Sequence, residues 1–113
     1  MRRPPTVKEL LAVLDKSTIR VVARARVNGR PVRGYCDDTH ITIGKALHPG
    51  KFDEMVLTTI HELCHVRDEL KEDHRFHHDK IPRWEVRLGK SHALCGAVAV
   101  RLGNAVLFGD GDP

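Results

Sequence analysis

Apolar residues recur every three to four positions in four parts of the chain, and this period predicts helices. The first helix is expected over 7–16, because the preceding Thr6-Val7-Lys8-Glu9 has the spacing of a capping box. A long second helix is expected from about Asp53, and two more over 79–88 and 91–107. Helices are therefore expected at the start of the chain, in its centre and near its end.

The segment between the first two helices alternates apolar and polar residues, which is typical of strands with one buried face. Every second residue is apolar over 19–27, so one strand is expected there. Asn28-Gly29 predicts a hairpin, because both residues tolerate positive φ, and the return strand is expected over 30–36. His40-Ile41-Thr42-Ile43 is rich in β-branched residues and predicts a third strand. The expected fold class is α+β, with an N-terminal helix, a three-stranded sheet with a hairpin, a central helix and C-terminal helices.

Composition limits the class of protein. The 113 residues have the size of one domain, which we place at 1–108, with 109–113 as a disordered tail. Hydrophobic residues make up 41% and charged residues 30%, a balance that excludes an intrinsically disordered chain. The three cysteines lack the spacing of a disulfide framework or a zinc ribbon, which favours a reducing compartment. Because no secretion signal or membrane-spanning run is recognisable, we expect a cytoplasmic protein without a membrane partner.

Positive charge is concentrated near the N-terminus. The net charge is +4, but residues 1–33 hold nine basic side chains against Glu9 and Asp15, a local charge of +7 that leaves −3 for the rest. Five arginines belong to the expected strands and their hairpin: Arg20, Arg24, Arg26, Arg30 and Arg33. The first three would share one face of the strand expected over 19–27. We interpret these arginines as a candidate DNA-binding surface, with an ordinary solvated face as the alternative.

The expected central helix contains the motif His61-Glu62-Leu63-Cys64-His65. Residues four apart on a helix lie one above the other, about 6 Å apart along the axis, so two imidazoles at this spacing can bind one metal ion. A carboxylate beside the metal can take a proton from an activated water and pass it to a leaving group. The motif predicts a catalytic Zn²⁺ site with His61 and His65 as ligands and Glu62 as the general acid/base. The alternative is a helix whose histidines face solvent or form hydrogen bonds without a metal.

A catalytic zinc site needs a third protein ligand. Four candidates follow the motif: His74, His77, His78 and Glu85. His77 is favoured, with His78 as the main alternative. A helix that begins just after His77 places three apolar side chains on one face: Ile81, Trp84 and Leu88. Glu85 would suit a site completed by a carboxylate from a second helix, and Asp68 can accept the second N–H of a ligating imidazole.

The motif and its surroundings resemble the SprT-like (Spartan-type) zincin metallopeptidases. The resemblance covers about residues 6–90 and rests on three stretches: Gly34-Tyr35-Cys36, Ile41-Thr42-Ile43-Gly44-Lys45-Ala46-Leu47 and Val56-Leu57-Thr58-Thr59-Ile60-His61-Glu62-Leu63-Cys64-His65. It implies a minimal zincin-like domain with His61, His65 and His77 (or His78) as zinc ligands and Glu62 as the catalytic acid/base. The family usually has His-Gly at the third ligand and an aromatic residue four positions on, where this chain has His77-His78 and Ile81. Many members also carry a C-terminal zinc ribbon that helps them act on DNA-bound proteins, and this sequence contains none.

Two functions of different classes follow from these features. The first is a zinc-dependent metalloprotease that hydrolyses protein or peptide substrates, with DNA-associated proteins as candidate targets. The second is a basic nucleic-acid-binding module in which the metal site is structural or vestigial. The two are compatible, because a protease recruited to DNA needs both a catalytic site and a basic surface.

Overall fold

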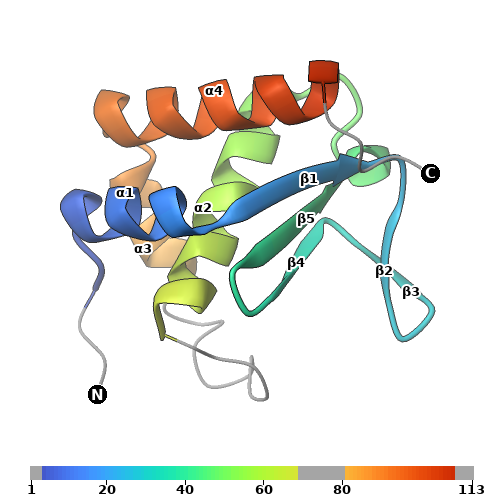
Figure 1. Cartoon of the computed structure of the whole chain (residues 1–113), viewed down its shortest axis with the longest axis horizontal. Coiled ribbons are helices and arrows are strands. Elements are labelled where there is room, and N and C mark those ends of the chain that lie inside the picture. Colours follow the sequence, from blue (N-terminus) through green and yellow to red (C-terminus); the bar gives the residue numbers. More distant parts are fainter. Residues whose placement is uncertain (1–3, 69–80, 109–113) are drawn as a thin grey trace.

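The computed structural model of the protein describes residues 4–68 and 81–108 (Figure 1). Its elements follow in the order α1 (Val7–Lys16), β1 (Thr18–Val22), β2 (Ala25–Val27), β3 (Arg30–Val32), β4 (Gly34–Asp37), β5 (His40–Gly44), the 3₁₀ helix η1 (Lys45–Leu47), α2 (Phe52–Asp68), α3 (Ile81–Leu88) and α4 (His92–Phe108). The fold class is α+β, with an N-terminal helix, a small mixed sheet and C-terminal helices, which confirms the expectation from the sequence. The part of the chain expected to be a tail, 109–113, lies outside the described residues.

Helix α1 is fixed at both ends by side chains. At its start the capping box is formed: the Thr6 amide donates to Glu9 Oε1 at 3.0 Å, and the Glu9 amide donates to Thr6 Oγ1 at 3.1 Å. At its end the Arg101 guanidinium, from α4, donates to the carbonyl oxygens of Leu14 at 2.9 Å and Ser17 at 2.5 Å. The Leu14 carbonyl also accepts from the amide of the C-cap residue Ser17 at 3.1 Å, so Arg101 adds a second donor at the end of α1 and joins this helix to α4.

Strands β1, β5 and β4 form a three-stranded sheet in that order, in which β5 runs parallel to β1 and antiparallel to β4. The single strand expected over 19–27 is wrong, because β1 ends at Val22 and β2 begins at Ala25. At the end of β5, Gly44 pairs with Val22 and packs against Ala25. A Cβ on Gly44 would lie 2.8 Å from the Ala25 amide nitrogen. The chain therefore leaves the sheet here and passes over the end of β5, which only a glycine permits.

The hairpin predicted at Asn28-Gly29 is present. Asn28 has φ 52° and Gly29 φ 78°, and this turn joins β2 to β3 with Val27 opposite Arg30. The return strand expected over 30–36 is two strands, because β3 pairs with β2 whereas β4 pairs with β5. The hairpin therefore extends beside the three-stranded sheet as a separate two-stranded unit (Figure 1).

Helix α2 lies at the centre of the molecule and contacts α1, α3, α4, β4 and β5 (Figure 1). Its core-facing residues Ile60, Leu63 and Cys64 are fully buried. Helices α3 and α4 add further buried apolar side chains: Trp84, Leu88, Leu94, Val98 and Leu102. The Arg67 guanidinium lies 5.5 Å from the centre of the Trp84 ring and ties the end of α2 to α3. No helix within the described ranges is long and apolar enough to cross a membrane.

Candidate active site

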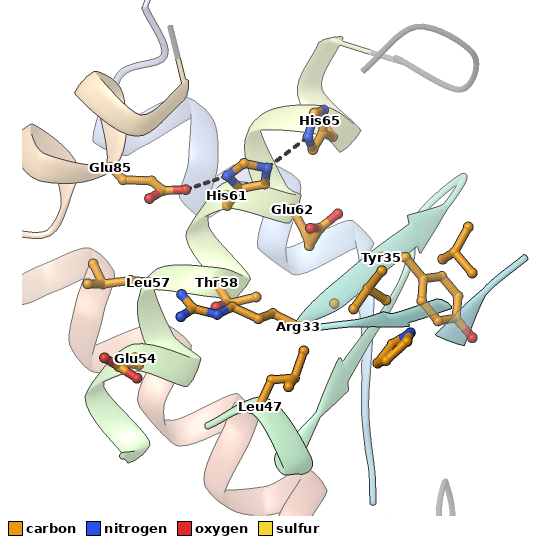
Figure 2. A pocket seen from close by; sticks show the side chains of 14 residues that line it. Arg33, Tyr35, Leu47, Glu54, Leu57, Thr58, His61, Glu62, His65 and Glu85 are labelled. Carbon is orange, nitrogen blue, oxygen red and sulfur yellow. Dashed lines mark hydrogen bonds and ion pairs between the residues drawn. The ribbon is translucent and has the colours of Figure 1, made fainter. Parts of the chain in front are cut away.

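His61 and His65 lie one turn apart on α2 and turn their rings toward each other (Figure 2). Their Nε2 atoms are 3.0 Å apart, and the ring planes meet at 64°. His65 is buried, whereas His61 is half-buried. Two nitrogen lone pairs do not face each other at this distance, so either one nitrogen carries a hydrogen that the other accepts or both bind one cation. The structure thus brings the two motif imidazoles to a shared point.

Glu85 of α3 accepts a hydrogen bond from Nδ1 of His61 (Figure 2). In a neutral imidazole this bond places the hydrogen on Nδ1 and leaves the lone pair on Nε2, which faces His65. Glu85, which the sequence offered as one candidate for the third ligand, therefore contacts the His61 ring on the side away from His65. The sequence suggested Asp68 as the acceptor of the second N–H of a ligating imidazole, but its side chain lies outside the described ones.

Glu62 lies beside the histidine pair and is only 5% exposed. Burial raises the pKa of its carboxyl from 4.5 to about 7, although the neighbouring His61 and a hydrogen bond from the Cys36 thiol act in the opposite direction. Burial, with the negative charge of Glu62, raises the pKa of Cys36 to about 12, so this thiol stays protonated and can donate. No pattern in the sequence predicted that Cys36, on β4, would contact Glu62.

A cleft of about 760 Å³ lies along α2 in front of these residues. Side chains between Glu54 and His65 form one wall, and the hairpin and β4, between Val27 and Tyr35, form the other. Leu47 and Glu85 lie toward its opposite ends (Figure 2). The walls meet at Gly34, where a Cβ would lie 3.2 Å from Thr58 Cγ2 and 3.0 Å from Ile43 Cδ1. A glycine here lets β4 approach α2 closely, so the two walls of the cleft meet at this point.

His48 is a third histidine on this side of the molecule, and it is 2% exposed. Its Nδ1 lies 2.7 Å from the Gly44 carbonyl oxygen, and its Nε2 lies 2.8 Å from Thr58 Oγ1. A carbonyl oxygen only accepts, so Nδ1 is the donor in the first bond. His48 therefore joins the end of β5 to α2, which is a structural role.

The five arginines of the expected strands and hairpin are all exposed. Arg20 donates from Nη2 to the Tyr35 hydroxyl at 3.4 Å on the sheet. Arg24 and Arg26 line a second, smaller pocket of about 230 Å³, whereas Arg33 lines the main cleft. Arg20 belongs to β1 and Arg26 to β2, so alternation along one strand does not place them on a shared face.

The favoured third ligand and its alternatives, His77, His78 and His74, lie outside the described residues. Within residues 4–68 and 81–108, no group of three or more His, Cys, Asp or Glu side chains is arranged to hold a metal ion. Trp84 and Leu88 are buried together, as expected of a helix that begins after His77. The described chain thus supplies two facing imidazoles, a buried carboxyl and a carboxylate that accepts from His61.

Comparisons of the chain with family models, with curated proteins and with solved structures find no match. The function must therefore be argued from the arrangement of the site.

Proposed function

We propose that this chain is a zinc-dependent metallopeptidase, similar to the SprT-like (Spartan-type) zincins, which hydrolyses peptide bonds with Glu62 as the general acid/base. The observation that carries the proposal is the 3.0 Å approach of the His61 and His65 Nε2 atoms at the wall of a cleft. A carboxyl buried beside them lowers folding stability when it ionises, and such local costs are typical of functional sites.

The donors fit a zinc ion. Two nitrogen ligands about 2.0–2.1 Å from a tetrahedral zinc lie roughly 3.3 Å apart, which is close to the 3.0 Å between the two Nε2 atoms. Glu85 holds His61 in the tautomer whose Nε2 can bind metal. We propose His77 as the third ligand, with His78 as the alternative. A zinc ion held by these residues would polarise the scissile carbonyl and increase the acidity of a water molecule.

Glu62 accepts the proton of the attacking water and returns it to the amine that leaves. A general acid/base works best when its pKa lies near the working pH. In the metal-free protein burial raises the pKa of Glu62 above its usual range, so the buried position of Glu62 is part of the proposed chemistry. The protonated Cys36 thiol donates to the ionised carboxylate and holds it in place.

The test of this mechanism is the Glu62→Gln variant. Hydrolysis of unfolded, fluorescently labelled casein should fall about 10²-fold to 10⁴-fold, while the zinc content per chain stays that of the wild type. The matched control is Glu54→Gln, which replaces another carboxylate on the same helix and the same wall. Unchanged hydrolysis in Glu62→Gln would refute the assigned role.

The third ligand is tested by measuring zinc in purified variants. His77→Ala should lose zinc, while His78→Ala and the control His92→Ala, an exposed position on α4, should retain it. Loss in His78→Ala instead would assign the ligand to His78. Zinc retained by both single variants and by the double variant would exclude this pair.

A second candidate function is nucleic-acid binding, either with the protease activity or without it. The supporting observation is that all five arginines are exposed and that Arg24 and Arg26 line a pocket together. Phosphate contacts make affinity fall steeply with salt, by powers of ten between about 50 and 200 mM. Fluorescence anisotropy with a DNA duplex should show this fall, and Arg24→Ala with Arg26→Ala should weaken binding and reduce the salt slope. The control is Lys51→Ala, an exposed cation just before α2. Absent or salt-insensitive binding would remove this function.

A further inference from the structure

Exposed apolar side chains line the cleft. Among the described residues, eight large hydrophobic side chains are exposed, and three of these line the cleft: Val27 (39%), Leu47 (41%) and Leu57 (38%). They come from the hairpin, η1 and α2, so only the fold brings them together. Apolar side chains that converge in a concave site are typical of ligand-binding sites, whereas isolated ones on a convex surface are ordinary.

One of these apolar side chains, Leu57, lies on the same helix as the histidines. Leu57 precedes His61 by one helical turn, about 6 Å along α2, and both line the same cleft. An extended polypeptide advances about 3.3 Å per residue. A chain laid along α2 with its scissile bond at His61 therefore has a side chain about two residues away that lies against Leu57.

The opposite wall suits an extended chain. Strand β4 is an edge of the three-stranded sheet, and the residues that lead into it also line the cleft: Pro31, Val32 and Arg33. Sheet edges take up polypeptides in extended conformation through their main chain. Val32 lines the same cleft as Leu47 and Leu57, so such a polypeptide would meet apolar side chains from the hairpin as well as from α2 and η1.

The apolar wall is held in place before any ligand arrives. His48 fixes η1, and with it Leu47, by bonding to Gly44 and Thr58. Leu57 is supported from behind by Gly89, where a Cβ would lie 3.0 Å from Leu57 Cδ2. A preformed surface costs little ordering on binding, which increases its contribution to affinity.

We propose that Leu47, Leu57 and the apolar residues of the hairpin form a subsite for a large apolar side chain of the substrate, about two residues from the scissile bond. The inference rests on the proposed peptidase function and adds a substrate class to it: extended or unfolded polypeptide segments that carry a large aliphatic or aromatic residue near the cut.

The first test measures binding without catalysis. A fluorescein-labelled ten-residue peptide of Gly, Ala and Ser with one central leucine is compared with its serine counterpart on metal-free Glu62→Gln protein. Partial burial of a leucine side chain should make the leucine peptide bind about fivefold to tenfold more tightly. Leu57→Ser and, independently, Leu47→Ser should reduce this ratio below about twofold. The control Val100→Ser, a 63% exposed position on α4, should leave it unchanged. Equal binding of the two peptides would overturn the subsite.

The second test maps the cuts that the zinc-loaded protein makes in unfolded casein, by mass spectrometry. Large apolar residues should be enriched at one position about two residues from the cuts, and the enrichment should vanish in Leu47→Ser and Leu57→Ser. Cleavage that needs Glu62 but shows no apolar preference would overturn the subsite and leave the proposed function standing. Tighter binding of the leucine peptide without any cleavage of casein would support the apolar site and refute the proposed peptidase function. Sedimentation that reveals a dimer dissociated by Leu47→Ser would also overturn the subsite, because the wall would then contact a second copy.

Discussion

Two regions along the same side of α2 use histidines in opposite ways. At the junction with β5, the ring nitrogens of His48 both meet the protein, one at the Gly44 carbonyl and the other at the Thr58 hydroxyl. In the middle of the helix, His61 and His65 instead direct Nε2 atoms at each other, with Glu85 on the far nitrogen of His61. The first arrangement completes the fold, whereas the second leaves two ring nitrogens facing each other, as the proposed zinc site requires. Burial alone does not separate these roles; the partner of each nitrogen does.

The largest expected effect is a loss of zinc affinity on replacing His61, compared with little change on replacing His48. His61→Ala removes a proposed ligand, so affinity should fall well over 100-fold, more than the 10–100-fold that loss of an outer partner costs. His48→Ala should change the affinity by less than about threefold in protein that remains folded. Competition with a chelating dye measures both. Equal losses in the two variants would remove the distinction.

The second prediction concerns Glu62, which is buried in the histidine region. Its folded-state pKa of about 7 lies above the ordinary 4.5, so the folded protein binds this proton more tightly than the unfolded chain. The associated stability is present below pH 4.5 and is lost as the pH rises through 7. The full loss is about 3 kcal/mol.

Glu62→Gln has no proton to lose and should remove this dependence. In metal-free protein, urea unfolding should show the variant about 3 kcal/mol more stable than the wild type at pH 8, and similar to it at pH 4. The matched control Glu54→Gln, on the exposed part of the same wall, should follow the wild-type profile. A wild-type stability that does not fall between these pH values would contradict the prediction.

The difference between the regions also explains what the sequence could predict of the fold. The capping box at Thr6 and the Asn28-Gly29 turn act through neighbours in the chain, and both are present as predicted. The end of β1 at Val22 depends instead on Gly44, which is distant in sequence and packs against Ala25. The alternating pattern continues through this turn, because the exposed Ala23 and Val27 happen to extend it. Periodicity could not reveal a change of partner strand.

The same contrast holds for the site. His61, Glu62 and His65 belong to one helix, so their proximity follows from helical spacing alone. The sequence offered Glu85 as a candidate from its residue type, but its contact with His61 Nδ1, like the contact of Cys36 with Glu62, depends on the packing of α3 and β4 against α2, which has no local signal in the sequence. The grouping of side chains within one helix was therefore predictable, whereas their contacts with side chains of other elements were not.

The third prediction concerns the contribution of His48 to the free energy of unfolding. His48→Ala removes a buried ring and leaves the Gly44 carbonyl and the Thr58 hydroxyl without it, which should cost about 2–3 kcal/mol. The matched control is His40→Ala, an exposed histidine whose Nδ1 lies 2.6 Å from Thr18 Oγ1. Its loss should cost less than about 1 kcal/mol, since water replaces an exposed hydrogen bond. Urea unfolding of both variants without metal measures the difference, and equal costs would show that His48 is not a structural tie.

The smallest expected effect tests whether Glu85 orients the His61 ring in the proposed zinc site. Glu85→Gln keeps an acceptor for His61 Nδ1–H but removes the negative charge that increases the basicity of the ring. Zinc affinity should fall about tenfold, toward the low end of the range for an outer partner, while zinc stays at one per chain when saturating. Glu85→Ala removes the acceptor as well, so its zinc affinity should fall further, toward 100-fold below that of the wild type. If instead Glu85→Gln lost zinc as completely as His61→Ala does, Glu85 would be a direct ligand, and the helix that carries it would have to bring its carboxylate round to the Nε2 side of the ring.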